Sequence, residues 1–213
     1  IDLPCDRPRP AVPTRHRHIV EGVLDGGLAH RLQKVAQHAN TPLDAVLLGA
    51  FVTLLHRWSG EVDLVVGLSC HEAPSPWQRE PLPLRVDCSD SPSFLDMVKR
   101  VHKIQALARA HGYPSLPQLA EALGAESAVP RLPIFGVGFA TRDSAENAPD
   151  TVGHVGSASE TSAAEMLDLT LEMMDGPEGP AGRMTCSADR FELETVSRLW
   201  ERFVVLLVSL IHI

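Results

Sequence analysis

Two histidine-containing segments are the first places where side chains of this sequence could do chemistry. His16 and His18 are two residues apart, so on an extended strand both imidazoles would point to one face and could share a metal ion. No third ligand is identifiable near them, which favours surface histidines on a strand edge. Cys70 and His71 have the residue types of a nucleophile and its base, but neighbours in an extended chain point to opposite faces. The sequence therefore predicts neither a metal site nor a catalytic dyad in these segments.

Two aspartates are the next candidates. Asp168 and Asp189 lie on or beside two expected strands, and a pair of carboxylates could serve as acid and base. An aspartate at a strand end or before a helix is more often a cap or another structural contact. We therefore expect structural roles for both residues.

Glycine, serine and aromatic patterns also stop short of a site. The segment Gly136-Val137-Gly138 lacks the third glycine and the following helix of a dinucleotide fingerprint, and no GxxxxGK[ST] is present. The segment from Gly67 to Ser69 does not complete a GxSxG nucleophile elbow. The sequence thus predicts no catalytic, cofactor-binding or metal-binding residue. Packing in the core is the expected role of the aromatic residues Phe51, Trp58, Phe94, Phe139, Trp200 and Phe203.

The composition limits the class of protein. The 213 residues carry a net charge of −8 without a basic run, which disfavours nucleic acid as a partner. The longest apolar stretch, 204–213, has about half the roughly 20 residues that a membrane-spanning helix needs. Four scattered cysteines without a CxxC pair favour reduced thiols and a cytoplasmic protein. The first residue is Ile1, which suggests a piece of a longer polypeptide.

The elements that must position these residues alternate between strands and helices. Apolar alternation and short apolar runs predict strands at 16–24, 63–68, 84–86, 134–140, 167–174 and 183–188. Apolar stripes of helical period predict helices at 28–39, 43–59, from Ser93, near 116–123, and from Val196 onward. Residues 73–83 and 141–163 are expected to be loops, the second mobile. Thr41 should cap the second helix, with Pro42 at its first position. This order predicts an α/β fold in which helices cover a mixed sheet.

Six segments in order along the chain resemble the condensation domains of nonribosomal peptide synthetases. Residues 3–10, LPCDRPRP, resemble the family's LPTDRPRP, and residues 55–67, LHRWSGEVDLVVG, resemble its LHRYSGQDDIVVG. Ser91-Pro92-Ser93-Phe94 is similar to its DPSF, and residues 131–139, RLPIFGVGF, to its RNPLFQVMF. Asp168-Leu169-Thr170-Leu171 matches its DLTL, and residues 189–203 resemble its DLF and closing helix. Each motif is weak alone, but six in register are specific.

The resemblance implies a single chloramphenicol-acetyltransferase-like lobe. Residues 1–14 would be an extended linker, and residues 15–213 the C-terminal lobe of a truncated condensation domain without its first lobe. The family joins an acyl or peptidyl group, held on the phosphopantetheine arm of one carrier protein, to an amine held on another. Its catalytic HHxxxDG lies in the first lobe, and the segment from His16 to Gly22 lacks both the paired histidine and the Asp-Gly spacing.

Two departures from the family bear on function. Residues 74–83 are short and proline-rich without the family's FVNT, and His111-Gly112-Tyr113-Pro114 only partly matches its HQDLPFE. We therefore expect a noncatalytic scaffold for antibiotic or other natural product biosynthesis, with adenylation and carrier protein domains as partners. The alternative is the C-terminal half of an amide-forming or epimerase-type enzyme, completed by an HHxxxDG lobe. Surface that partner domains cover is expected at the apolar helix end 206–213.

Overall fold

The computed structural model describes residues 2–10, 14–69, 81–111, 119, 121–122, 135–142, 167–174 and 179–210. Helices and strands alternate along this part of the chain. They follow the order β1 (Arg17–Val23), α1 (Gly26–Ala39), α2 (Leu43–Ser59), β2 (Asp63–Ser69), β3 (Leu82–Asp87), α3 (Phe94–Ala110), β4 (Val137–Arg142), β5 (Leu169–Met174), β6 (Ala181–Ser187) and α5 (Leu193–Leu210).

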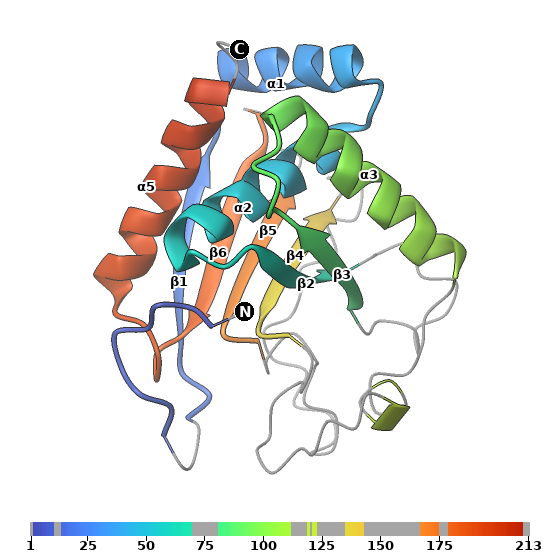
Figure 1. Ribbon diagram of the computed structural model, residues 1–213. Helices are drawn as coiled ribbons and strands as arrows, with labels where there is room; N and C mark the ends of the chain where they lie inside the picture. Colours follow the sequence, from blue (N-terminus) through green and yellow to red (C-terminus); the bar gives the residue numbers. More distant parts are fainter. Residues whose placement is uncertain are drawn as a thin grey trace, which may run out of the picture.

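The strands form one mixed sheet with the order β1-β6-β5-β4-β2-β3. β4 runs parallel to both β2 and β5, and the other neighbours are antiparallel. Figure 1 shows α2 lying across the sheet, with α5 beside β1 and α3 toward β3. The predicted fold, helices against a mixed sheet, is confirmed, and so is the hairpin of β5 and β6.

Side-chain alternation explains why one face of the sheet is covered by helices. In β1 the side chains of Ile19, Glu21 and Val23 are exposed, while Val20 between them packs against the core. β5 and β6 alternate in the same way, and their buried residues include Leu171. The alternation predicted for residues 16–24 is therefore correct.

Helix α2 lies at the centre of the core. Ten of its residues are buried, on more than one side of the helix, as expected for a helix that is apolar nearly all round. The ring of Phe51 lies 6.1 Å from that of Phe139 and 6.4 Å from that of Phe203. Within the described residues no single helix is long and apolar enough to cross a membrane. Helices α1 and α2 reach the required length and apolar composition only when taken together, and they are bent by 100° relative to each other.

Trp200 of α5 fills a shallow trough over two glycines. Gly22 of β1 and Gly182 of β6 are direct partners in the sheet, and both present bare backbone to the indole. A Cβ atom on Gly22 would lie 2.5 Å from Trp200 Nε1, and one on Gly182 would lie 2.3 Å from Trp200 Cη2. The two glycines therefore allow α5 to approach the sheet closely at its β1 edge.

Several boundaries differ from the sequence-based prediction. Helix α2 begins at Leu43 with Pro42 at its N-cap, and the Thr41 hydroxyl makes no capping bond, so the predicted threonine cap is wrong. The strand predicted from residue 134 begins at Val137 instead. Residues 141–142 belong to β4 and residues 82–83 to β3, although both pairs were expected in loops. The rest of those two loops, and most of the helix predicted near 116–123, lie outside the described residues.

Candidate functional site

Residues 2–10, which we call the N-terminal strap, cross the end of the sheet where β5 begins and β6 ends. Leu3 anchors the strap because its side chain is buried in the core, with only 6% exposed. The backbone N–H groups of Asp6 and Arg7 both donate to the carbonyl of Arg190, at 3.0 and 3.2 Å. The segment that resembles the family's LPTDRPRP therefore packs against the lobe.

Asp6 binds the N-terminal end of α5. One carboxylate oxygen accepts from the backbone N–H of Glu192 at 2.8 Å, and the other accepts from the Thr195 hydroxyl at 3.0 Å. A carboxylate in this position satisfies a free N–H group and interacts favourably with the helix dipole. Arg7 forms an ion pair with Glu192 at 2.5 Å, in which both side chains are about half exposed.

Asp168 is one of only two buried polar or charged residues in the described part of the chain. Its carboxylate pairs with the Arg9 guanidinium at 2.5 Å, and the two side chains are 12% and 22% exposed. Its backbone N–H donates to the Gly136 carbonyl at 2.7 Å, and its carbonyl accepts from the Ser187 N–H at 2.9 Å. Asp168 thus fixes the strap to the start of β5.

Asp189 is held separately from Asp168. Its two oxygens accept from the backbone N–H and the hydroxyl of Thr14, both at 2.6 Å. Each aspartate therefore binds its own partner from the N-terminal segment. Both aspartates therefore make structural contacts, as expected from the sequence.

The other candidates from the sequence are placed as follows. His16 is exposed, His18 is half-buried, and β1 is the outermost strand of the described sheet, as expected for edge histidines. Among the described residues, no group of three or more His, Cys, Asp or Glu side chains could hold a metal ion. Cys70 and His71 lie outside the described residues.

Glycines of the central strands serve packing. A Cβ on Gly138 would lie 2.6 Å from Leu167 Cδ1, and one on Gly67 would lie 2.2 Å from Phe135 Cε2. Each glycine therefore accommodates a large apolar neighbour. The six aromatic residues expected in the core all belong to it or pack against it.

Burial makes the described cysteines poor nucleophiles. It raises the pKa of Cys186 to about 11, and it raises the pKa of Cys88 as well. Burial also raises the pKa of Cys5, and it outweighs the opposite effect of the Arg190 guanidinium 2.6 Å from the sulfur. Because the thiolate is the reactive form, these three residues stay in the unreactive thiol state near neutral pH.

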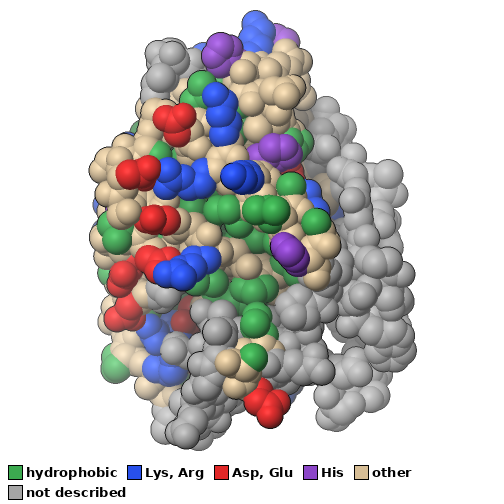
Figure 2. Space-filling model, turned by 45° about the vertical axis from the view of Figure 1, so that its right-hand side comes forward, with side chains coloured by type: hydrophobic (Ala, Val, Ile, Leu, Met, Phe, Trp, Pro, Cys, Tyr) green, Lys and Arg blue, Asp and Glu red, His purple; other side chains and the backbone are tan. Residues whose placement is uncertain are grey.

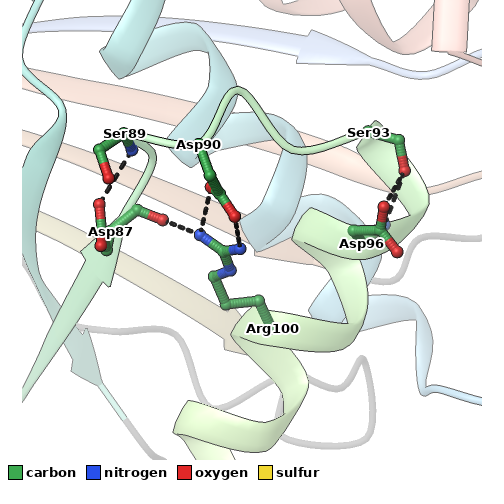
Figure 3. Close-up of polar contacts among 6 residues, drawn as sticks. All are labelled: Asp87, Ser89, Asp90, Ser93, Asp96 and Arg100. Carbon is green, nitrogen blue, oxygen red and sulfur yellow. Dashed lines mark hydrogen bonds and ion pairs between the residues drawn. The ribbon is translucent and has the colours of Figure 1, made fainter.

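The acidic residues at the turn between β3 and α3 form hydrogen bonds and an ion pair with neighbouring residues (Figure 3). Arg100 pairs with the Asp90 carboxylate at 2.6 Å and donates to the backbone carbonyl of Asp87. The guanidinium lowers the pKa of Asp90, and the Ser89 N–H lowers that of Asp87. Figure 2 shows Lys and Arg side chains lying among Asp and Glu on the face it presents. The contacts of Arg100, a residue of α3, therefore hold this turn against the helix, and the acidic cluster has a structural role.

Sequence reasoning missed a buried polar contact between α2 and α3. Gln105 is fully buried, and its amide N–H donates to Asp44 at 3.5 Å, while Arg109 approaches the same carboxylate oxygen at 3.4 Å. The sequence does contain a signal for this contact, because Gln105 is a polar residue on the apolar stripe of α3, at helical spacing from its neighbours in that stripe.

Comparisons with known proteins agree with this architecture. A sequence profile described as "Condensation domain" matches residues 1–212. A linear gramicidin synthase polypeptide of Brevibacillus parabrevis is 30% identical over 221 residues, which cover 99% of this chain and 4% of the synthase polypeptide. Phosphinothricin tripeptide synthetase PhsC of Streptomyces viridochromogenes is 30% identical over 97% of this chain and 20% of its own length. The chain therefore spans a small part of these relatives.

Solved structures match this chain over part of their own length, about half in the case of two X-domain structures. The X-domain from teicoplanin biosynthesis has 26% identity and a TM-score of 0.82, covering 99% of this chain and 50% of that one. The X-domain in its complex with OxyB matches with a TM-score of 0.81 and the same identity. A four-domain nonribosomal peptide synthetase bound to AMP and glycine has a TM-score of 0.82 at 18% identity, which shows the fold alone.

Proposed function

Since this chain belongs to the condensation-domain family of nonribosomal peptide synthetases, we propose that it is a noncatalytic, partial condensation domain that acts as a scaffold beside an adenylation domain. Residues 1–14 serve as the linker that leads into the lobe formed by residues 15–213. The synthetase that contains this domain assembles a natural product of the class made by nonribosomal peptide synthetases. Adenylation and carrier protein domains of the same synthetase are its partners.

The use of the two candidate carboxylates is the observation that supports this proposal most. Asp168 is neutralised by Arg9, and Asp189 accepts two hydrogen bonds from Thr14, so both bind the chain's own N-terminal segment. A general acid or base needs a carboxylate that can reach a substrate proton. Cys88 and Cys186 are buried thiols, and Cys5 is a half-buried thiol whose pKa is also raised by burial. The side chains that bind the two carboxylates are those of Arg9 and Thr14, and neither is a histidine. These contacts stabilise the fold, which supports a scaffold role for the domain.

A relative supports binding as the role. The teicoplanin X-domain, 26% identical to this chain, was solved in a complex with another protein, OxyB. A domain that contains a lobe of this fold can therefore bind a partner protein. We infer that this chain uses its surface in the same general way, toward the adenylation domain.

We expect no amide product when the isolated chain is incubated with a donor acyl group and an acceptor amine, each on a carrier protein. The reason is that none of its described side chains is placed as a general base toward an open site. Product is measured by mass spectrometry against a control without the chain. Product above that control would contradict the proposal and favour the alternative, the C-terminal half of an amide-forming enzyme.

A scaffold should gain stability from the domain beside it. We expect a polypeptide that continues from residue 213 into the adenylation domain to unfold its condensation lobe at a higher temperature than the isolated chain. An added interface that binds only the folded lobe stabilises it by mass action. Differential scanning calorimetry measures both, and a polypeptide with a long glycine-serine linker before the adenylation domain is the control. Equal melting temperatures for the lobe in all three would contradict the scaffold proposal.

A further inference from the structure

Gln105 of α3 is one of two buried polar or charged residues in the described part of the chain, and none of its surface is exposed. Its side-chain amide donates a hydrogen bond to Asp44 Oδ2. Its carbonyl oxygen, Oε1, is buried and has no hydrogen-bond partner. A buried acceptor without a donor costs free energy, so nearly all such groups in native proteins are satisfied by protein or by ordered water. Gln105 Oε1 therefore indicates a donor that is not a protein group.

Asp44, in the first turn of α2, carries a second oxygen of this kind. Its side chain is 20% exposed, and Oδ2 contacts both the Gln105 amide and the Arg109 guanidinium. The other carboxylate oxygen, Oδ1, is buried and has no hydrogen-bond partner. Carboxylate and amide oxygens only accept hydrogen bonds, so Asp44 Oδ1 and Gln105 Oε1 cannot satisfy each other. One molecule with two donors can satisfy both, because the two side chains are already in contact.

The polar groups between α2 and α3 stand farther apart than directly bonded groups do. The Gln105 amide lies 3.5 Å and the Arg109 guanidinium 3.4 Å from Asp44 Oδ2, beyond the usual range of about 2.7–3.2 Å. The same two helices approach closely elsewhere, because a Cβ atom on Gly49 of α2 would lie 3.2 Å from Val98 Cγ2 of α3. The long spacing is therefore confined to the polar contact, and polar groups at such a spacing are commonly bridged by water.

A half-turn of the Gln105 amide would not remove the need for a donor. It would exchange the amide nitrogen and Oε1, so that Oε1 faced the Asp44 carboxylate. Two acceptors would then oppose each other, and the carboxylate would lose the N–H group it now receives. The amide orientation in the structure is therefore the favourable one, and in this orientation Asp44 does not satisfy Gln105 Oε1.

We propose that a water molecule binds between α2 and α3, donating one hydrogen bond to Asp44 Oδ1 and the other to Gln105 Oε1. Buried waters typically bind in this way, to polar groups that the protein leaves unsatisfied. A metal cation suits the site less well, because the Arg109 guanidinium already places a positive charge beside the carboxylate. Hard cations also take about six or more oxygen ligands, whereas Asp44 and Gln105 offer two. The water joins the first turn of the central helix to α3.

A high-resolution crystal structure of the chain tests this site. We expect the electron density of one water within hydrogen-bond distance, about 2.6–3.2 Å, of both Asp44 Oδ1 and Gln105 Oε1. Crystals soaked in rubidium chloride distinguish water from a monovalent cation, because rubidium scatters anomalously and water does not. We expect no anomalous peak at the site. An anomalous peak there, or the absence of density between the two oxygens, would overturn the proposal.

A pair of glutamine variants tests whether Gln105 binds the water. Gln105→Leu removes Oε1 at a position on the apolar stripe of α3, and the density of the water should be lost. Gln33→Leu makes the same substitution on the exposed surface of α1 and should retain it. In the unsubstituted chain, NMR should show rotating-frame Overhauser cross-peaks from the Gln105 side-chain amide protons to a long-lived water, and none from those of Gln33. Density that persists in Gln105→Leu, or a Gln105 amide without the cross-peak, would refute the site.

Discussion

Replacing Arg9 by leucine is expected to lower the free energy of unfolding by about 3 kcal/mol. The substitution leaves the Asp168 carboxylate, whose side chain is 12% exposed, without its counter-charge. Removing one partner of a buried pair is costly because the remaining charge is desolvated without compensation. Urea unfolding followed by circular dichroism measures the difference.

Arg7 provides a matched control for this substitution. Its ion pair with Glu192 has the same 2.5 Å length and lies in the same strap, but its side chains are 53% and 51% exposed. Arg7→Leu should therefore cost less than about 1 kcal/mol. The double variant Arg9→Leu with Asp168→Asn should recover much of the loss, because no unpaired charge remains. Equal losses for the two arginine variants would show that burial of the Asp168 pair has no energetic role.

Replacing Trp200 by alanine is expected to lower the free energy of unfolding by about 4 kcal/mol. Its indole fills the trough over Gly22 and Gly182, so truncation leaves a cavity between α5 and the sheet. Thermal and urea unfolding of the variant measure the loss. Trp58→Ala, a substitution of a half-buried tryptophan at the margin of the core, should cost less.

A double-mutant cycle ties this cost to the trough. Gly182→Ala alone should destabilise by about 2 kcal/mol, because its Cβ would lie 2.3 Å from the indole. In the Trp200→Ala background that clash is gone and only the approach to Met173 Sδ at 3.1 Å remains, so the same substitution should cost much less. If Gly182→Ala costs the same in both backgrounds, the indole does not account for glycine at this position.

Much of the fold could be predicted because its elements carry their own periodic signals. The alternation in β1 and the apolar periodicity of α2 are local, so each is readable from the sequence alone. The errors also have local causes. Thr41 has the right residue type for a cap, but the N-cap position is taken by Pro42, and the threonine hydroxyl makes no hydrogen bond.

The candidate site could be predicted only in part because its contacts are distant in sequence. The bond from Arg9 to Asp168 joins residues 159 positions apart, and the bond from Glu192 to Asp6 joins residues 186 apart. Propensity and spacing report on neighbours along the chain, so they identified Asp168 and Asp189 as structural without naming their partners. The family resemblance identified the strap as a motif, and the structure shows what its charged residues bind.

The strap has a consequence for the order in which the chain folds. Asp6 caps α5, and Leu3 reaches the core beside it, so neither contact can form until residues 192–195 have left the ribosome. The β1–β6 pairing at the same edge likewise waits for residues 181–187. The pairing of β1 with β6 therefore joins the first and the last strand of the described sheet. Bringing these two strands together has an entropic cost, because they are far apart in the sequence. Synthesis therefore leaves β1 without its strand partner longer than any other strand of the described sheet.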